Sequence, residues 1–296
     1  MKDSKNRKEN DMPDMPLELI FGNYMAWKYD DSTWIISFME GTEYIYLLEG
    51  DEYALLTDTG YGVNNLRAFA EKLTDKPILV ANTHYHPDHS AGNGEWESVM
   101  LSEGWTLDAP AVEREGAGPY DLSKYPHPDY EKKIVRDGDV IDLGGRKITI
   151  WEAYDAHCNS SLFFIDESHK LALTGDEFEA AQTMMYDNSW NPEAPYNVDK
   201  RIDNMKANAE RIKAICGEGW KLLPNHNGTP LSIGYLNEYI ELADAIYAGT
   251  AKIEDKLNHR FVEMDPKAPE LCRVRHKHCS IFIKKAEVMK IYGTRK

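Results

Sequence analysis

The sequence predicts an α/β protein whose helices are layered against β-sheets, and three observations support this fold class. Segments rich in aromatic and β-branched residues recur along the chain and predict strands. Segments with helical hydrophobic spacing lie between them, and this order predicts helices packed on sheets. A cluster of histidines and an aspartate directly follows one of the strands. Because loops at strand ends usually carry the chemistry of such folds, the cluster marks a candidate site.

The first half of the chain contains a strand–helix–strand unit. The segments 34–38, 44–48 and 53–57 are rich in aromatic and β-branched residues and predict an antiparallel meander. Apolar residues then recur at helical spacing over 66–73, which predicts a helix with one buried stripe. The apolar run 78–82 predicts a short buried strand that leads into the histidine cluster.

Two hairpins are predicted in the middle of the chain. The segments 140–143 and 147–151 flank a Gly-Gly turn, which is a hairpin signal. The segments 162–165 and 171–174 flank a short polar loop and predict a second hairpin.

The last third of the chain alternates predicted helices and strands. A helix is expected over 202–216 with Cys216 as a core thiol, then a central strand over 220–224. A long helix over 236–246 and a strand over 273–283 complete the prediction. The strands thus fall into two strand-rich halves, at about residues 17–165 and 166–285.

The domain organisation is predicted from composition and periodicity. Residues 1–15 are polar and predict a loose tail, and 16–296 predict a single domain. Periodic signals weaken between about 94 and 133, which we interpret as an insertion, either a lid or a surface excursion. A C-terminal extension is expected at about 250–296.

Charge and cysteine content exclude several classes of protein. Among 296 residues, 34 are basic and 50 acidic, and the formal charge of −16 argues against a nucleic-acid partner. No run approaches the roughly 18 apolar residues of a membrane span, and the charged N-terminal segment lacks the apolar core of a signal peptide. The four cysteines form no disulfide framework, which predicts a cytoplasmic location with reduced thiols. The oligomeric state is not predicted.

The central motif is the segment 84–89, which has the spacing H-x-H-x-D-H. Imidazole and carboxylate groups are the donors that zinc takes in proteins. Two pairs of candidate ligands within one loop suggest two metal ions. The candidates are His84, His86, Asp88 and His89.

Two metal ions need more donors than this cluster supplies, and three further candidates follow predicted strands. His157 follows the strand 147–151 by a few residues, and His226 comes just after the strand 220–224. Asp176 comes after Gly175, which allows a sharp turn at the end of a strand. Each candidate therefore lies where a strand gives way to a loop.

In this order, the motifs resemble those of the metallo-β-lactamase superfamily, in its glyoxalase II and lactonase branch. The D-T-G corner at Asp58 also matches, so the resemblance runs from about residue 34 to residue 226. It implies a four-layer αββα sandwich with the site at one edge, between the two sheets. It also implies a ligand set: His84, His86 and His157 for the first metal, Asp88, His89 and His226 for the second, Asp176 bridging both, and Asp58 orienting a ligand histidine.

The resemblance implies a metal-dependent hydrolase of small molecules. Two zinc ions, with iron or manganese as substitutes, would activate a bridging hydroxide toward an ester, lactone or thioester. Asp88 would hold the hydroxide and accept its proton. Three alternatives stay open: a β-lactam hydrolase, a single-iron sulfur dioxygenase, and a metal-stabilised binding protein without catalysis.

This sequence departs from the family pattern beside two of the ligands. Ala156 and Cys158 flank the third-motif histidine where glycine and threonine are common, and the last motif reads Pro-Asn-His-Asn-Gly over 224–228. Cys158 is an alternative ligand, but His157 matches better. These differences alter loop geometry, so they bear on the substrate more than on metal binding.

Substrate contacts are open at this stage. A tyrosine of the insertion or Tyr186 could donate a hydrogen bond to the oxyanion. Arg273, Arg275 and Lys277 either contact an anionic substrate group or face solvent.

Overall fold

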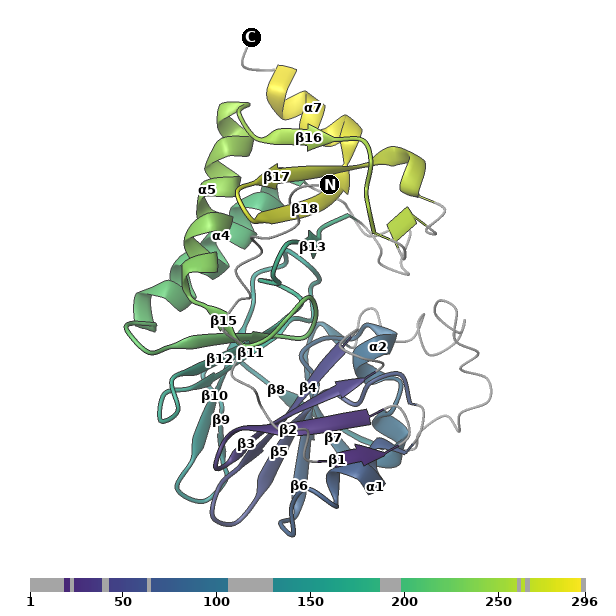
Figure 1. The fold of residues 1–296 in the computed structure, drawn as a ribbon, viewed down its shortest axis with the longest axis vertical. Coiled ribbons are helices and arrows are strands. Elements are labelled where there is room, and N and C mark those ends of the chain that lie inside the picture. The colour runs from purple at the N-terminus through teal and green to yellow at the C-terminus, as the bar shows by residue number, and fades with distance from the viewer. Residues whose placement is uncertain are drawn as a thin grey trace, which may run out of the picture.

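The computed structural model describes residues 19–21, 24–38, 43–62, 65–105, 130–186, 198–259, 262–263 and 267–293. Two β-sheets pack face to face with helices on both outer faces, and a third sheet lies at one end of this sandwich (Figure 1). The predicted N-terminal tail and residues 106–129 of the predicted insertion lie outside the described residues.

Eight strands form the first sheet, in sequence order from β1 to β8. Strands β1 to β5 are antiparallel and include the predicted meander. From β5 to β8 the neighbouring strands are parallel. Helix α1 connects β5 to β6 and carries the chain back to the end of the sheet at which β5 begins, as a parallel pair requires. The strands are β1 (Leu19–Phe21), β2 (Tyr24–Asp30), β3 (Thr33–Phe38), β4 (Glu43–Glu49), β5 (Ala54–Thr57), β6 (Ile78–Ala81), β7 (Ser98–Ser102) and β8 (Glu131–Val135).

Six strands form the second sheet, in the order β15-β14-β12-β11-β10-β9. Both predicted hairpins are present, as β9–β10 and β11–β12, and β14 pairs in parallel with β12. The strands are β9 (Val140–Asp142), β10 (Lys147–Glu152), β11 (Leu162–Asp166), β12 (Leu171–Gly175), β14 (Lys221–Pro224) and β15 (Leu231–Ser232). The predicted division of the strands near residue 165 is wrong, since β9 to β11 already belong to the second sheet.

Helices cover both outer faces of the sandwich. The described helices are α1 (Leu66–Ala70), α2 (Pro87–Ser90), α4 (Val198–Ile215), α5 (Gly234–Ala248) and α7 (Lys285–Gly293), with short 3-10 turns at η1 (Asn93–Glu95) and η3 (Ala268–Glu270). Helix α1 ends earlier than its predicted stripe, although Leu73 beyond it is still buried. Cys216 directly follows α4 and is buried in the core, as predicted.

Three apolar clusters establish the layer order. Leu66 and Phe69 of α1 cluster with the outer face of the first sheet, for example with Ile36. Leu55 of the first sheet and Phe164 of the second belong to the cluster between the two sheets. A further set joins the second sheet to the two long helices: Phe163, Ile165, Ile202 and Tyr239. The order is helix, sheet, sheet, helix, which confirms the predicted αββα sandwich.

A third sheet of four strands, in the order β13-β18-β17-β16, was not predicted. The single strand predicted over 273–283 is wrong, because the segment forms a hairpin whose tip turns at Lys277, with φ 51°. The strands are β13 (Thr183–Met184), β16 (Lys252–Glu254), β17 (Leu271–His276) and β18 (Cys279–Lys284). We call these four strands the C-terminal sheet. The prediction of one domain over 16–296 stays a prediction.

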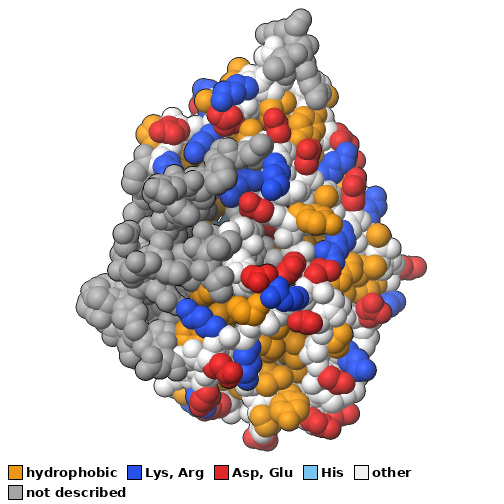
Figure 2. Space-filling model, turned by 180° about the vertical axis from the view of Figure 1, so that it is seen from behind, with side chains coloured by type: hydrophobic (Ala, Val, Ile, Leu, Met, Phe, Trp, Pro, Cys, Tyr) orange, Lys and Arg blue, Asp and Glu red, His pale blue; other side chains and the backbone are white. Residues whose placement is uncertain are grey.

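The described surface has no single-sign charged face in the view of Figure 2. Acidic and basic side chains are interspersed there with small apolar patches. None of the described helices is long and apolar enough to cross a membrane.

Candidate metal centre

The first donor cluster is positioned by the end of strand β6 and the short helix α2. Pro87 occupies the first turn of α2, where its missing N–H costs no hydrogen bond and its fixed φ favours the helix. His84 and His86 therefore precede the helix, whereas Asp88 and His89 lie within its single turn. This change from strand to helix turns the four side chains toward one region.

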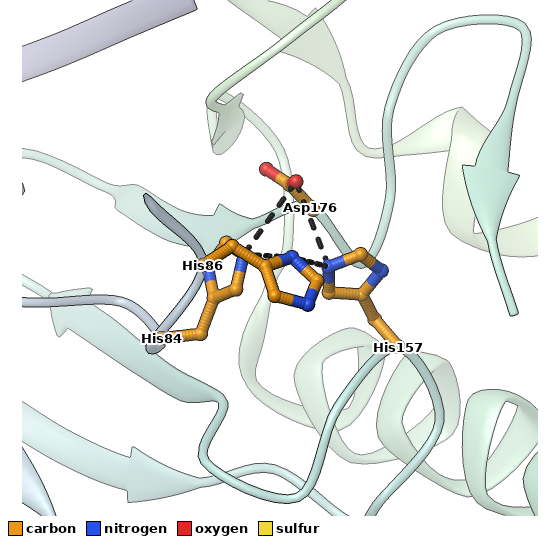
Figure 3. A group of neighbouring side chains, drawn as sticks. All are labelled: His84, His86, His157 and Asp176. Carbon is orange, nitrogen blue, oxygen red and sulfur yellow. Dashed lines mark hydrogen bonds and ion pairs between the residues drawn. The ribbon is translucent and has the colours of Figure 1, made fainter. Parts of the chain in front are cut away.

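The first donor group consists of His84, His86, His157 and Asp176. Nδ1 of His86 lies 3.0 Å from Nε2 of His84 and 3.1 Å from Nε2 of His157. Oδ2 of Asp176 is 3.6 Å from both Nε2 atoms. Figure 3 shows the three imidazoles converging beneath the carboxylate, from loops far apart in sequence.

The second donor group consists of Asp88, His89 and His226. The Nε2 atoms of His89 and His226 are 3.2 Å apart. Oδ2 of Asp88 lies 3.6 Å from the first and 3.4 Å from the second. All seven predicted ligand candidates thus fall into two adjacent groups, divided as the resemblance implies.

Asp176 lies between the two groups. Its Oδ2 atom is within 3.4–3.6 Å of the Nε2 atoms of His84, His89, His157 and His226. Its Oδ1 atom is buried and has no hydrogen-bond partner. Gly175 adopts φ 56°, and a Cβ there would lie 3.1 Å from Cβ of Thr83, so the predicted sharp turn requires glycine.

The donor spacing fits zinc at both groups. A tetrahedral zinc ion with nitrogen or oxygen ligands at about 2.0–2.1 Å holds neighbouring donor atoms about 3.3 Å apart. The measured separations of 3.0–3.6 Å bracket this value. The unpartnered Oδ1 atom of Asp176 is a further donor that the protein leaves open. The two groups could therefore each hold a divalent metal ion.

Asp58 connects the loops that carry these donors. Its carboxylate accepts hydrogen bonds from the N–H and the hydroxyl of Thr83, at 2.6 and 2.7 Å, and from the amide of Asn225 at 2.5 Å. Nδ1 of His89 lies 3.2 Å from the same carboxylate. This contact leaves Nε2 of His89 directed at the donor group, the usual arrangement around a metal-ligating histidine.

His157 is held by its own set of contacts. Nδ1 lies 2.8 Å from the carbonyl oxygen of Met184, so that nitrogen carries the proton and Nε2 is free to act as a donor. The backbone N–H of His157 donates to Glu177, and Arg201 donates to the carbonyls of Ala156 and His157. These bonds fix a loop in which the family's usual glycine is replaced.

Burial and neighbouring charges separate the histidines into two kinds. Burial lowers the pKa of His84, of His157 and of His86, the last to about 3, so these imidazoles are neutral and could act as metal ligands. Burial also acts on His226, but the Asp176 and Asp88 carboxylates outweigh it and raise its pKa to about 10. The pKa of His89 is raised for the same reason, by Asp176 and Asp88.

The carboxylates respond in the opposite direction. Burial would raise the pKa of Asp176, but His226, His89 and His84 hold it well below its usual value. The pKa of Asp88 is lowered against burial by His89 and His226. The positive charges of His89 and His226 thus face the negative charges of Asp88 and Asp176. A divalent cation bound here could take the place of the two protons and neutralise both carboxylates.

Several residues near the site were not singled out from the sequence. Asn225 bonds Asp58, and Asn227 donates to Glu179, whose pKa is raised to about 8 by burial and by Asp176. Glu43 is fully buried with both carboxylate oxygens unpartnered, and burial raises its pKa well above the usual value. Only Asn225 and Asn227 had a sequence signal, as the two neighbours of the candidate ligand His226.

The structure gives the positions of two alternatives from the sequence. Cys158 belongs to neither donor group; it lies in the apolar cluster of the first sheet, with Sγ 3.2 and 3.3 Å from the hydroxyls of Ser160 and Ser161. Tyr186 is buried near Met184, with its hydroxyl 3.9 Å from Sδ. The insertion tyrosines before residue 130 lie outside the described residues.

The αββα layers, with two histidine–aspartate groups that could bind metal at the ends of their strands, define an αββα metalloprotein fold. A sequence model of the metallo-beta-lactamase superfamily matches residues 39–226, more than half of the chain. The chain therefore belongs to the metallo-β-lactamase superfamily.

Curated relatives include two kinds of hydrolase. Acyl-coenzyme A thioesterase MBLAC2 of Homo sapiens is 26% identical over 217 residues, covering 62% of this chain and 73% of the relative. Hydroxyacylglutathione hydrolase of Methylobacterium nodulans is 34% identical over 114 residues, or 38% of this chain and 37% of that enzyme. With the family match, they identify the chain as a hydrolase of this superfamily.

Solved structures show the same fold. A beta-lactamase domain protein from Burkholderia ambifaria superposes with a TM-score of 0.57 at 17% identity, covering 78% of this chain and 80% of that one. A metallo-beta-lactamase from Pontibacter korlensis gives a TM-score of 0.54 at 16% identity, covering 75% and 99%. At this identity the likeness concerns the fold alone.

Proposed function

We propose that this chain is a dinuclear zinc hydrolase that cleaves an ester, lactone or thioester of a small molecule. The observation that carries the proposal is the position of Asp176, whose Oδ2 atom lies 3.4–3.6 Å from four histidine nitrogens that belong to two groups. A carboxylate shared in this way suits a pair of ions better than a single ion. Iron or manganese would suit the same nitrogen and oxygen donors.

In the proposal, each residue has a defined task. His84, His86 and His157 hold the first ion, and Asp88, His89 and His226 hold the second. Asp176 contacts both, and Asp58 orients His89 through Nδ1. Bound zinc supplies a nucleophile at neutral pH by lowering the pKa of a coordinated water to about 7.

Asp88 is assigned the proton transfer. Its side chain is 24% exposed, whereas that of His89 is fully buried and that of Asp176 is 8% exposed. Asp88 is therefore the donor residue most open to an incoming substrate. Its pKa is held below the usual value by His89 and His226, so the carboxylate is ionised, and its exposure is what lets it reach a proton of the nucleophile.

A thioester is the substrate that the comparisons favour. MBLAC2 is named a thioesterase, and the hydroxyacylglutathione hydrolases are named for release of an acyl group from glutathione. The described residues hold no feature that favours a β-lactam, a single-iron oxidation or binding without catalysis. The cytoplasmic location stays a prediction.

Metal analysis and a substrate panel test the proposal. Protein purified without chelator is analysed for zinc, iron and manganese, then assayed on matched esters, lactones and thioesters. We expect two ions per chain and turnover of at least one acyl substrate. One tightly bound ion per chain, or two ions with no hydrolysis of any panel member, would reject the proposal.

A further inference from the structure

Two arginines are buried within the described part of the chain, and they differ in their contacts. Arg146 is 3% exposed, and its guanidinium donates to Asp166, to Thr33 and to the carbonyl of Ser32. Arg273 is 6% exposed, and it forms no ion pair with a described carboxylate. Because a buried cation without a counter-ion is unfavourable, Arg273 needs a further explanation.

Arg273 is held in place by one edge of its guanidinium only. Nε donates to the hydroxyl of Ser280 at 2.8 Å, and that hydroxyl donates to the carbonyl of Ala181 at 2.6 Å. The guanidinium carbon lies 5.9 Å from the ring centre of Phe282. Among the described residues, its two Nη groups donate no hydrogen bond, and neither is sealed from solvent.

The charged neighbours of Arg273 compensate its charge only in part. Glu254 is opposite Arg273 on the adjacent strand and interacts with it electrostatically, but its carboxylate forms its ion pair with Lys252, at 2.6 Å. Arg275 lies two residues along the same strand, on the same face. On β16 and β17, Lys252, Arg273 and Arg275 therefore carry three positive charges against the one carboxylate of Glu254 on this face.

Strand register connects Arg273 to the candidate metal centre. Arg273 is paired with Phe282, and Phe282 is paired with Met184 on the next strand. Met184 is the residue whose carbonyl contacts His157 at 2.8 Å. Neighbouring strands are about 4.8 Å apart, so the backbone of Arg273 lies about 10 Å from that of Met184.

The face that carries Arg273 is the one turned away from α5 and α7. Cys272, Val274 and Ile281 point to the other face and join the cluster around α5 and α7. On the Arg273 face, Phe282 belongs to a small apolar cluster with Tyr186, Leu257, Val262 and Leu271, and Met184 packs against this cluster.

His259 lies on the same face, since its ring centre is 5.5 Å from that of Phe282. Strand register and this ring contact thus place Arg273 on the face that holds Phe282 and His259, two strands from the residue whose carbonyl contacts His157.

We propose that Arg273 binds an anionic group of the substrate, a phosphate or a carboxylate, two strands from the carbonyl that contacts His157. The inference rests on the proposed function and adds a substrate class to it: an acyl compound with a negatively charged end. The free Nη groups form the planar fork that matches two oxygens of such an anion. The apolar patch around Phe282 would contact the segment between the anion and the cleaved bond.

Three thioesters test the inference and separate the two anions. S-acetyl-N-acetylcysteamine is neutral, S-succinyl-N-acetylcysteamine adds a carboxylate to the acyl side, and acetyl-coenzyme A adds phosphates to the thiol side. Zinc-loaded wild type and Arg273→Gln are compared on all three. For one of the two anionic substrates, we expect KM of Arg273→Gln to be at least about tenfold higher than KM of wild type, which corresponds to the loss of one charge-assisted hydrogen bond. KM for the neutral thioester should stay within twofold.

Two further variants control for charge and for folding. Lys277→Gln removes an exposed cation from the tip of the same hairpin, where it pairs with Glu241, and should leave every KM within twofold. Arg273→Lys keeps the charge and should recover part of the lost affinity. If Arg273→Gln changes all three substrates equally, or none of them, Arg273 does not bind an anion.

A binding measurement separates this inference from the proposed function. Calorimetric titration of the zinc-loaded proteins with adenosine 3′,5′-bisphosphate and with succinate needs no turnover. For one probe, we expect a Kd at least tenfold larger in Arg273→Gln than in wild type. Equal Kd values, or no binding of either probe to wild type, would reject the anion site. Absence of turnover on all thioesters would count only against the proposed function.

Discussion

Seven candidate donor residues from four segments of the chain meet at this site, and their positions follow from where strands end. The H-x-H-x-D-H spacing predicted four of them, and the strand-to-loop positions of His157, Asp176 and His226 predicted the rest. The contacts that orient these donors could not be predicted in the same way. Asn225 reaches Asp58 across 167 positions, and a hydrogen bond over that separation has no local sequence signal.

Asp176→Asn tests the shared donor at the residue scale. The substitution keeps the shape but removes the charge that lies within 3.4–3.6 Å of four histidine nitrogens. Changes that only orient a ligand cost about 10–100-fold, so losing a direct contact should lower activity by at least that factor. Metal content and kcat/KM are the measurements. Glu167→Gln, in an exposed turn, is the control. Near-full activity with both ions retained would contradict the role of Asp176 as a shared donor and would favour a β-lactamase-like site.

Asp88→Ala tests the division into two groups. The Asp88 carboxylate contacts His89 and His226 but forms no ion pair with His84 or His157. We therefore expect the variant to lose metal from the second group while the first keeps most of its ion. Competition of wild type and variant with a graded series of chelators measures both affinities. Equal weakening of both ions would contradict the assignment.

At the element scale, Arg146 joins the two sheets of the sandwich. It lies just before β10, bonds Asp166 at the end of β11, and donates to residues of the β2–β3 turn and β3 in the other sheet. The ion pair is almost fully enclosed, with side-chain exposures of 3% and 0%. Removing Arg146 would leave the buried Asp166 carboxylate with only its contacts to Ser168 and His169.

Arg146→Met should therefore lower the free energy of unfolding by about 3–5 kcal/mol. Urea unfolding, followed by tryptophan fluorescence, measures the change. Arg136→Met is the matched control, because its ion pair with Glu103 is exposed at 58% and 62%. Exposed pairs contribute about 0–1 kcal/mol, so the control should change little. Similar losses for both variants would show that the sheet-to-sheet contact adds no stability.

The sequence predicted the long and periodic elements and missed the short ones. Hairpins β9–β10 and β11–β12 have clear turn signals, and α4 and α5 have clear apolar stripes. Strands β13 and β15 have two residues each, too few for any periodicity. The β17–β18 hairpin turns at Lys277 and His278 without glycine, proline or asparagine, so its two strands were read as one.

On the scale of the whole molecule, the donor groups should make stability depend on bound metal. The Nε2 atoms of His89 and His226 are 3.2 Å apart, and the carboxylates of Asp176 and Asp88 lie beside them. Ions bound at 100 times their dissociation constant would add about 2.7 kcal/mol each to the stability of the folded state. The metal-loaded protein should therefore be the more stable form.

Treatment with EDTA followed by its removal should lower Tm by several degrees, and stoichiometric zinc should restore it. For a chain of this size, about 1 kcal/mol corresponds to about 2–4 °C. Differential scanning calorimetry measures the shift. Magnesium, which prefers six oxygen ligands, is the control ion and should restore nothing. An unchanged Tm in all three states would show that the groups do not bind metal in the folded protein.

Strand β13 is hydrogen-bonded to β18 on one side and supplies the carbonyl that orients His157 on the other. A ligand that tightens the C-terminal sheet around Arg273 would thus also fix the tautomer and the direction of a metal donor. Thermodynamic linkage makes such coupling reciprocal, so an anion that strengthens zinc binding must itself be bound more tightly, by the same factor, once zinc is present. The selectivity of this protein would then depend on cooperation between two ligands of opposite charge, each of which prepares the site of the other.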